Sequence, residues 1–252
     1  MDKFINGISV IVSCYNKLPY IGQAIDSVFN QDIDYPIEVI VCDDASTDGS
    51  YQYLLKNYSA QVRLLYNDSN VGPAITRNKC LDIAKYRFIA FLDGDDIWLP
   101  NKLRVQMKHF DSRKNIVVFT NSRIVDQNGV FLKTRSVDGF RFSWSSLLKI
   151  NPIPFSSAIV DRQLAADFRI PDIPKRQDYA LWLNLLRKGD AINCGEPLIE
   201  YRLSPGSISR SWRVGLFYYN YKALRYSGKL SRIHSFCLLF FHVIAKIKQY
   251  YS

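Results

Sequence analysis

Three aspartates lie within four positions of one another after an apolar run in the first half of the chain. The segment FIAFLDGDDIWLP, residues 88–100, begins with five apolar residues. The aspartates Asp93, Asp95 and Asp96 follow directly after them. Carboxylates this close repel one another unless a cation or a shared proton relieves the repulsion. Mg²⁺ and Mn²⁺ prefer oxygen ligands, and the D-x-D spacing of Asp93 and Asp95 lets both converge on one ion. These two residues therefore predict a divalent metal site, whereas Asp96 could equally cap a helix.

A second acidic pair, Asp43 and Asp44, follows the segment of residues 37–42, in which residues 39–42 form an apolar run. Both apolar runs have the length and the continuous hydrophobicity of strands buried on both faces of a parallel sheet. Parallel strands end at the same edge of a sheet, and open α/β sheets bind their ligands at that edge. We therefore expect the acids after the two runs to line one cleft.

A further acid, Asp178, opens the segment RQDYALWLNLLRKG, residues 176–189, which has an apolar helical face. An aspartate in the first turn of a helix is commonly only a partner of the helix dipole, so these residues alone leave its role open. The three histidines, His109, His234 and His242, offer no rival base because none follows a strand beside a nucleophile.

The elements that must position these acids alternate between strand-like and helix-like patterns. Strands are expected at about 8–16, where the end leads into a loop, and at about 37–44, 62–67 and 88–92, with helices at about 19–31, 50–58 and 74–85. This alternation is typical of βαβ units and predicts an α/β fold, with a mostly parallel central sheet and helices on both faces.

Composition fits a globular protein with a sizeable core. The chain has 252 residues, of which 48% are hydrophobic and 22% charged, so one domain with an appendage is expected. Its five cysteines are widely spaced and form no CxxC pair, which indicates neither a zinc cage nor a disulfide framework. We interpret them as reduced thiols of a cytoplasmic protein.

The positive charge is concentrated at the C-terminal end. The formal net charge is +10, yet no acid follows Glu200, and the nine Lys and Arg residues after it leave residues 1–200 with only +1. Basic residues mixed with aromatics suit an anionic membrane surface or nucleic acid, and the apolar segment 236–245 favours the membrane. That segment is too short to span a bilayer. We expect peripheral attachment at the inner face of the plasma membrane and no nucleic acid, with plain packing of the tail as the alternative.

Five segments, in order, resemble the family 2 inverting glycosyltransferases of the GT-A fold, of the kind that assembles bacterial O-antigen and other surface polysaccharides. They are SVIVSCYN, VIVCDDASTDGS, NVGPAITRN, FLDGDDIWLP and RQDYALWLNLLRKG, followed by YRLSPGSIS, and they extend over about residues 7–209. The resemblance implies a catalytic domain at 1–209, with a nucleotide-sugar half at about 1–100 and an acceptor half at about 101–209. Residues 210–252 would form a basic, aromatic helical tail.

The same resemblance assigns roles to individual residues. It implies that Asp93 and Asp95 hold the ribose and a Mg²⁺ or Mn²⁺ ion on the diphosphate of a nucleotide sugar, with Asp95 the more direct ligand. It implies that Asp178 is the general base, although Gln177 replaces the acid that the family carries before it. The donor would be a UDP-hexose or UDP-N-acetylhexosamine, and the acceptor a saccharide on a polyprenyl diphosphate. The implied nucleotide contacts are Ser13, Tyr15 (stacking on the base), Asp43, Asp44, Arg77, Asp93 and Gly94, and the implied acceptor or diphosphate contacts are Arg202, Arg210 and Trp182.

Three other function classes share part of this pattern. An aspartyl phosphatase would place D-x-D near the first strand and follow it with Gly-Thr, whereas here the motif lies near the fourth strand and Asp-Ile follows it. A sugar-nucleotide nucleotidyltransferase would share fold and metal, but it usually carries a glycine-rich basic loop near the N-terminus, which SCYNKLPYIG is not. A non-catalytic, membrane-associated sugar-binding relative is disfavoured because Asp93, Asp95 and Asp178 are all present.

Overall fold

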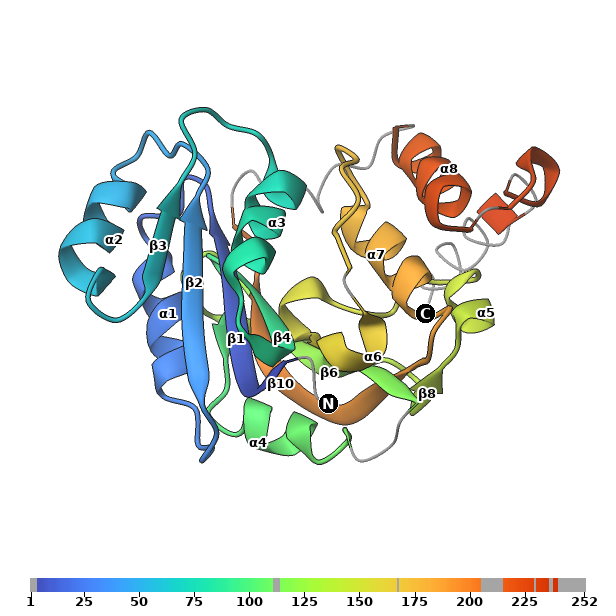
Figure 1. The fold of residues 1–252 in the computed structure, drawn as a ribbon, viewed down its shortest axis with the longest axis horizontal. Coiled ribbons are helices and arrows are strands. Elements are labelled where there is room, and N and C mark those ends of the chain that lie inside the picture. The colour runs from blue at the N-terminus through green and yellow to red at the C-terminus, as the bar shows by residue number, and fades with distance from the viewer. Residues whose placement is uncertain are drawn as a thin grey trace.

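The centre of the molecule is one ten-stranded sheet (Figure 1). Eight of its strands follow one another in the order β3-β2-β1-β4-β9-β6-β10-β5, and the other two pair at the side, β7 with β6 and β8 with β10. The computed structural model describes residues 4–110, 114–166, 168–204, 215–228, 230–235 and 238–239. The strands are β1 (Ile5–Cys14), β2 (Ile37–Asp43), β3 (Arg63–Tyr66), β4 (Tyr86–Asp93), β5 (Ile97–Trp98), β6 (Asn115–Val125), β7 (Phe131–Arg135), β8 (Arg141–Phe142), β9 (Ile159–Asp161) and β10 (Asp190–Arg202). Strands β1 to β4, β6 and β10 run in one direction, which confirms the expected mostly parallel sheet.

Helices cover both faces of this sheet. They are α1 (Ile21–Phe29), α2 (Ser50–Tyr58), α3 (Pro73–Ile83), α4 (Lys102–Met107), α5 (Trp144–Leu147), the 3-10 turn η1 (Phe155–Ser157), α6 (Arg162–Ala165), α7 (Gln177–Leu185) and α8 (Gly215–Gly228). Successive side chains of a strand point to opposite faces. In β1, Val10 and Val12 accordingly pack with α1, α2 and α4, whereas Ile11 packs with α3 and α7. Figure 1 shows α1 and α2 on one side of strands β1 to β3 and α3 on the other.

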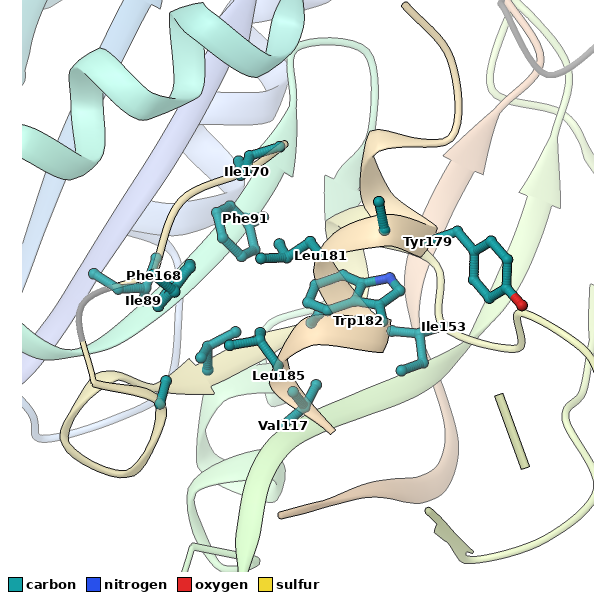
Figure 2. Packing of buried hydrophobic residues seen from close by; sticks show 14 of the residues in the cluster. Ile89, Phe91, Val117, Ile153, Phe168, Ile170, Tyr179, Leu181, Trp182 and Leu185 are labelled. Carbon is teal, nitrogen blue, oxygen red and sulfur yellow. The ribbon is translucent and has the colours of Figure 1, made fainter. Parts of the chain in front are cut away.

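Helix α7 is fixed to the central strand β4 by aromatic packing. The Trp182 ring is fully buried, and its centroid lies 6.2 Å from that of Phe91 on β4 and 5.7 Å from that of Phe155 in η1. Figure 2 shows Trp182 on this helix, in the same cluster as Ile153 and Leu181. This packing determines where the first turn of α7, with Asp178, lies relative to the end of β4.

The C-terminal appendage is described only in part. Helix α8 packs against α7, and its Ala223 and Leu224 are fully buried in the core cluster that contains α7. The expected apolar segment 236–245 lies outside the described residues except for residues 238 and 239. In the part of the chain that is described, no helix has both the length and the apolar character needed to cross a membrane.

Lys102, the first residue of α4, is an unusual buried lysine. Its side chain is fully buried, its Nζ lies 3.7 Å from the centroid of the Trp98 ring, and Nζ has no hydrogen-bond partner among the residues described. Burial lowers the pKa of Lys102 well below its usual value of 10.5. At pH values between the lowered and the usual pKa, Lys102 binds a proton in the unfolded chain but not in the folded chain. The free energy of unfolding therefore falls as the pH falls through this range.

We therefore expect Lys102→Met to be more stable than the wild-type protein at neutral pH. Each unit by which the pKa is lowered corresponds to about 1.4 kcal/mol, and each kcal/mol to about 2–4 °C in melting temperature for a domain of this size. The gain should shrink as the pH approaches about 10, where the unfolded lysine also loses its proton. Thermal unfolding across this pH range measures it, with the exposed Lys108→Met as control. A variant that is less stable at neutral pH, or a difference that does not change with pH, would contradict this account.

Candidate active site

The acids that follow the strands meet at one edge of the sheet, as expected. Ser13 of β1 lies opposite Cys42 of β2 and Asp93 of β4, and Cys14 lies opposite Asp43. Because these three strands are parallel and in register, the residues after them share the carboxyl edge, where ligands bind in open α/β sheets.

The loops after β1 and β2 are joined to each other at this edge. Asn16 and Ala45 both adopt left-handed backbone conformations, with φ of 52° and 60°, which is costly for residues other than glycine. The backbone N–H of Asn16 donates to Ser46 Oγ (2.9 Å), and its side-chain Oδ1 accepts from the backbone N–H of Thr47 (2.8 Å). The two loops thus hold each other in place, and the neighbouring Tyr15 ring is 45% exposed at the rim.

Asp43 offers a buried acceptor to a ligand. Its side chain is fully buried, and Oδ1 accepts a hydrogen bond from the backbone N–H of Ser46 (2.8 Å). Its Oδ2 is also buried and receives no hydrogen bond from any residue the structure describes. A buried carboxylate oxygen without a donor is costly, so this position suits an N–H group of a ligand. A nucleobase stacked on Tyr15 could supply such a group.

Asp44, in contrast, organises the loop that leads into α3. Its Oδ1 accepts from the Asn67 side-chain amide (2.9 Å) and from the backbone N–H of Val71 (3.0 Å), and its Oδ2 accepts from the backbone N–H of Gly72 (2.9 Å). Gly72 has φ of 87°, a conformation that favours glycine. Asp44 therefore acts on the site by fixing the start of the helix that carries Arg77.

Arg77 reaches from α3 to the end of β4. Only 7% of it is exposed, one Nη lies 2.5 Å from Asp93 Oδ1, and its guanidinium carbon lies 4.2 Å from the centroid of the Phe155 ring. Arg77 is therefore not a solvated charge on the helix surface. It places a fixed positive charge beside the D-x-D motif.

Asp95 is held by two residues that the sequence did not single out. Its Oδ2 lies 2.5 Å from Lys17 Nζ and accepts a hydrogen bond from Ser204 Oγ (2.6 Å), and Lys17 Nζ also lies 3.1 Å from Ser204 Oγ. Gly94, between the two acids, donates its backbone N–H to the carbonyl of Ser13 (3.2 Å). A Cβ on Gly94 would lie 3.2 Å from that same oxygen and 3.1 Å from Ile21 Cδ1, so glycine avoids a tight contact at this close approach to β1.

Asp96 turns away from this pair and caps no helix. It is 1% exposed, its Oδ2 accepts from Ser156 Oγ (2.5 Å), and its Oδ1 accepts from the backbone N–H of Arg202 (3.0 Å). Burial raises the pKa of Asp96 well above its usual value, and the charges of Asp95 and Asp93 raise it further. Its role is to join η1 and the end of β10 to the D-x-D loop.

The expected acceptor contacts need correction. Arg202 is only 4% exposed. Its guanidinium donates to the carbonyls of Asp95 (3.0 Å) and Gln127 (3.1 Å) and to the side chain of Gln23 (3.2 Å). Trp182 is fully buried, so neither residue presents a surface to an acceptor; Arg210 lies outside the described residues.

Asp178 lies in the first turn of α7 and is partly exposed. The Asn151 side-chain amide donates to its Oδ2 (3.1 Å). Arg176 precedes the helix in a left-handed conformation, with φ of 64°, and Gln177 is 8% exposed and buried beneath the turn. An accessible carboxylate at this position can accept a proton from a nearby hydroxyl.

The D-x-D carboxylates suit a hard cation that shares its ligands with phosphate. Asp93 Oδ2 and Asp95 Oδ1 receive no hydrogen bond from the described part of the chain, so each acid keeps one oxygen available. Among the described residues no three His, Cys, Asp or Glu side chains are grouped to hold a metal by themselves. Mg²⁺ in nucleotide enzymes is typically held by one or two carboxylates together with substrate phosphates, and these two acids fit that arrangement.

Comparison with known proteins adds independent findings. The family model described as glycosyl transferase family 2 matches residues 9–165. Two Escherichia coli relatives are described as UDP-Glc:alpha-D-GlcNAc-diphosphoundecaprenol beta-1,3-glucosyltransferases. WfgD is 36% identical over 83% of this chain and 81% of its own length, and WfaP is 31% identical over 97% of this chain and 96% of its own.

Solved structures show the same fold at lower sequence identity. Residues 1–349 of S. aureus TarS, in complex with UDP-GlcNAc, match with a TM-score of 0.70 and 21% identity over 94% of this chain and 71% of that one. The mannosyltransferase PcManGT from Pyrobaculum calidifontis, in complex with GDP-Man and Mn²⁺, matches with a TM-score of 0.65 and 19% identity over the same shares of the two chains.

Proposed function

Because the chain belongs to glycosyl transferase family 2, we propose that it moves a hexose or N-acetylhexosamine from a UDP-sugar to a saccharide on a polyprenyl diphosphate, with inversion at the anomeric carbon. The names of WfgD and WfaP support both substrates: UDP-glucose as donor and GlcNAc-diphosphoundecaprenol as acceptor. Such a reaction belongs to the synthesis of a bacterial surface polysaccharide. UDP-glucose is therefore the first donor to test.

The donor half of the site would hold the nucleotide by its base and its diphosphate. Asp43 Oδ2 accepts an N–H of the uracil ring while the exposed Tyr15 ring stacks on it. Arg77, fixed beside Asp93, supplies positive charge near the phosphates. Asp95 and Asp93 would hold a Mg²⁺ or Mn²⁺ ion, which when bound neutralises the charge that develops on the departing UDP.

The acceptor half would supply the base. Asp178 takes the proton from the attacking hydroxyl, which then displaces UDP in a single step that inverts the anomeric carbon. A covalent route through cysteine is disfavoured because burial raises the pKa of the Cys14 thiol, and that of Cys194 to about 12. At neutral pH neither is the thiolate that a nucleophile requires.

One observation carries this proposal. Asp93 ends the central strand β4 and Asp95 follows it, each with one carboxylate oxygen that receives no hydrogen bond from the described residues, and Asp178 opens the helix that packs on that strand. Purified protein with Mn²⁺, a GlcNAc-diphosphate lipid and either UDP-glucose, UDP-galactose or UDP-GlcNAc should release UDP faster than without the lipid. Synthesis of a sugar nucleotide from UTP would favour the nucleotidyltransferase alternative. Binding of UDP-sugars without any turnover would favour a non-catalytic sugar-binding protein.

We further propose that residues 1–209 are the catalytic unit and that the basic tail, residues 210–252, attaches it peripherally to the inner face of the membrane. Each Lys or Arg near an anionic surface contributes about 1 kcal/mol, so several together give reversible attachment. We expect the protein to sediment with anionic vesicles at low salt and to be released at high salt, and deletion of residues 230–252 to weaken this binding. Binding that survives the deletion unchanged, or that never responds to salt, would show that the tail only packs on the catalytic unit.

A further inference from the structure

One short segment contacts both halves of the site. This segment, residues 151–157 with the sequence NPIPFSS, is called the bridging segment here. On the donor side, its Ser156 Oγ accepts from the backbone N–H of Asp93 (3.1 Å) and donates to Asp96 Oδ2 (2.5 Å), and its Phe155 ring lies under Arg77. At its other end, Asn151 donates to Asp178. The bridging segment therefore ties the D-x-D loop to the residue proposed as the base.

The bridging segment is built to be rigid. Pro152 and Pro154 are both buried and restrict its backbone, and Ile153 between them is only 2% exposed within the core (Figure 2). The backbone N–H of Ile153 donates to Asn151 Oδ1 (3.4 Å), so both ends of the Asn151 amide are engaged. The Asn151 side chain is therefore already ordered, and little conformational entropy is lost when it holds one orientation.

The contact of Asn151 with Asp178 leaves one carboxylate oxygen available. The Asn151 Nδ2 donates to Asp178 Oδ2 at 3.1 Å. Asp178 Oδ1 receives no hydrogen bond from the described residues, and the side chain is partly exposed. A neutral amide donor stops the carboxylate from rotating without adding a proton that could be transferred to it.

We propose that Asn151 is a positioning residue, whose amide holds Asp178 so that Oδ1 is presented to the acceptor hydroxyl. This inference rests on the proposed role of Asp178 as the general base. It assigns a function to a segment that lies between α5 and β9 and that carries no acid, histidine or cysteine.

Two substitutions separate positioning from packing. Asn151→Ala removes the donor, and Asn151→Asp keeps the shape of the side chain but replaces the donor with a second carboxylate. With UDP-glucose, Mn²⁺ and a GlcNAc-diphosphate lipid, both variants should lower kcat roughly 10- to 100-fold, the cost of misplacing a reacting group or of losing the partner that orients it. KM for the lipid should stay within about twofold of wild type, and so should the affinity for UDP measured by calorimetry. The substitutions should not change how tightly either molecule binds in the ground state. Asn57→Ala, which removes a surface asparagine whose amide donates to the carbonyl of Tyr53, is the matched control and should behave as wild type.

Two results would overturn the inference. One is a kcat for Asn151→Ala within twofold of wild type. The other is a wild-type kcat for Asn151→Asp, because a residue that only packs would tolerate a substitution that keeps its shape. If the alanine variant does not fold, the aspartate variant decides. Asp178→Asn, assayed in parallel, keeps the two proposals apart. If Asp178→Asn turns over normally, or the wild-type protein does not turn over, the proposed function fails; if Asp178→Asn is inactive while Asn151→Ala is normal, only the inference fails.

Discussion

Replacing Asp178 by asparagine should abolish glycosyl transfer while leaving UDP binding intact. A general base contributes about 10²- to 10⁴-fold to a rate, and the amide cannot take the proton of the acceptor hydroxyl. Asparagine has nearly the same shape, and its carbonyl oxygen can still accept the hydrogen bond from the Asn151 amide. We therefore expect a loss of turnover of at least about 100-fold with little change in melting temperature. Product formation measures the first quantity, and calorimetric titration with UDP shows whether the donor site is preserved.

The matched control for this experiment is Asp172→Asn, which makes the same chemical change at an exposed position just before α7. It should turn over as the wild-type protein does. Turnover of Asp178→Asn within tenfold of wild type would remove Asp178 from the mechanism, and a parallel loss of UDP affinity would show that the substitution disturbs the donor half as well.

Asp95→Asn should produce a loss of similar size on the donor side of the site. The substitution removes the charge that would bind the divalent ion and leaves Lys17, which now pairs with Asp95 Oδ2, without its partner. Stabilisation of a departing diphosphate by a metal supplies several kcal/mol, and each 1.36 kcal/mol is a factor of ten in rate. We expect turnover to fall by about three orders of magnitude, and the heat of Mn²⁺ binding to the complex with UDP to disappear.

Asp82→Asn is the control for the metal experiment, because Asp82 forms an exposed ion pair with Arg169 at the surface and should affect neither quantity. Rates of the Asp95→Asn variant are compared over a series of Mn²⁺ concentrations. Near-wild-type turnover at saturating Mn²⁺ would refute the metal role of Asp95.

Strands β1 to β4 could be predicted from the sequence, and the rest of the sheet, including the parallel pair β6 and β10, could not. Strands β1, β2 and β4 each contain a mostly apolar run, and helical patterns separate these runs, so their order and direction follow from local signals. Strands β5 and β8 have two residues each and β9 has three, too few for any periodicity to appear. Yet β9 joins the two halves of the sheet by pairing with both β4 and β6.

The site divides in the same way. Asp93, Asp95 and Asp178 have local signatures, because each follows or opens an element with a clear pattern. Their supporting residues do not: Lys17 and Ser204 are 78 and 109 positions away from Asp95, and Asn151 is 27 away from Asp178. Only the folded chain brings such pairs together.

Two of the implied acceptor or diphosphate contacts, Arg202 and Trp182, were misplaced. Arg202 has the charge expected of a diphosphate ligand, and Trp182 has the ring expected of a saccharide contact. Both are buried, with Arg202 hydrogen-bonded inside the protein and Trp182 packed on Phe91. Composition does not reveal burial of this kind, because the same residue types serve both purposes.

The anomeric configuration of the product tests the central claim most directly, since one base and no covalent intermediate require a single displacement. Wild-type protein is incubated with UDP-α-glucose, Mn²⁺ and a GlcNAc-diphosphate lipid, and the coupling of the new anomeric proton is read by NMR. We expect a β-linked product, with the configuration of the donor inverted. An α-linked product would contradict the mechanism, even if Asp178 and Asp95 both proved essential.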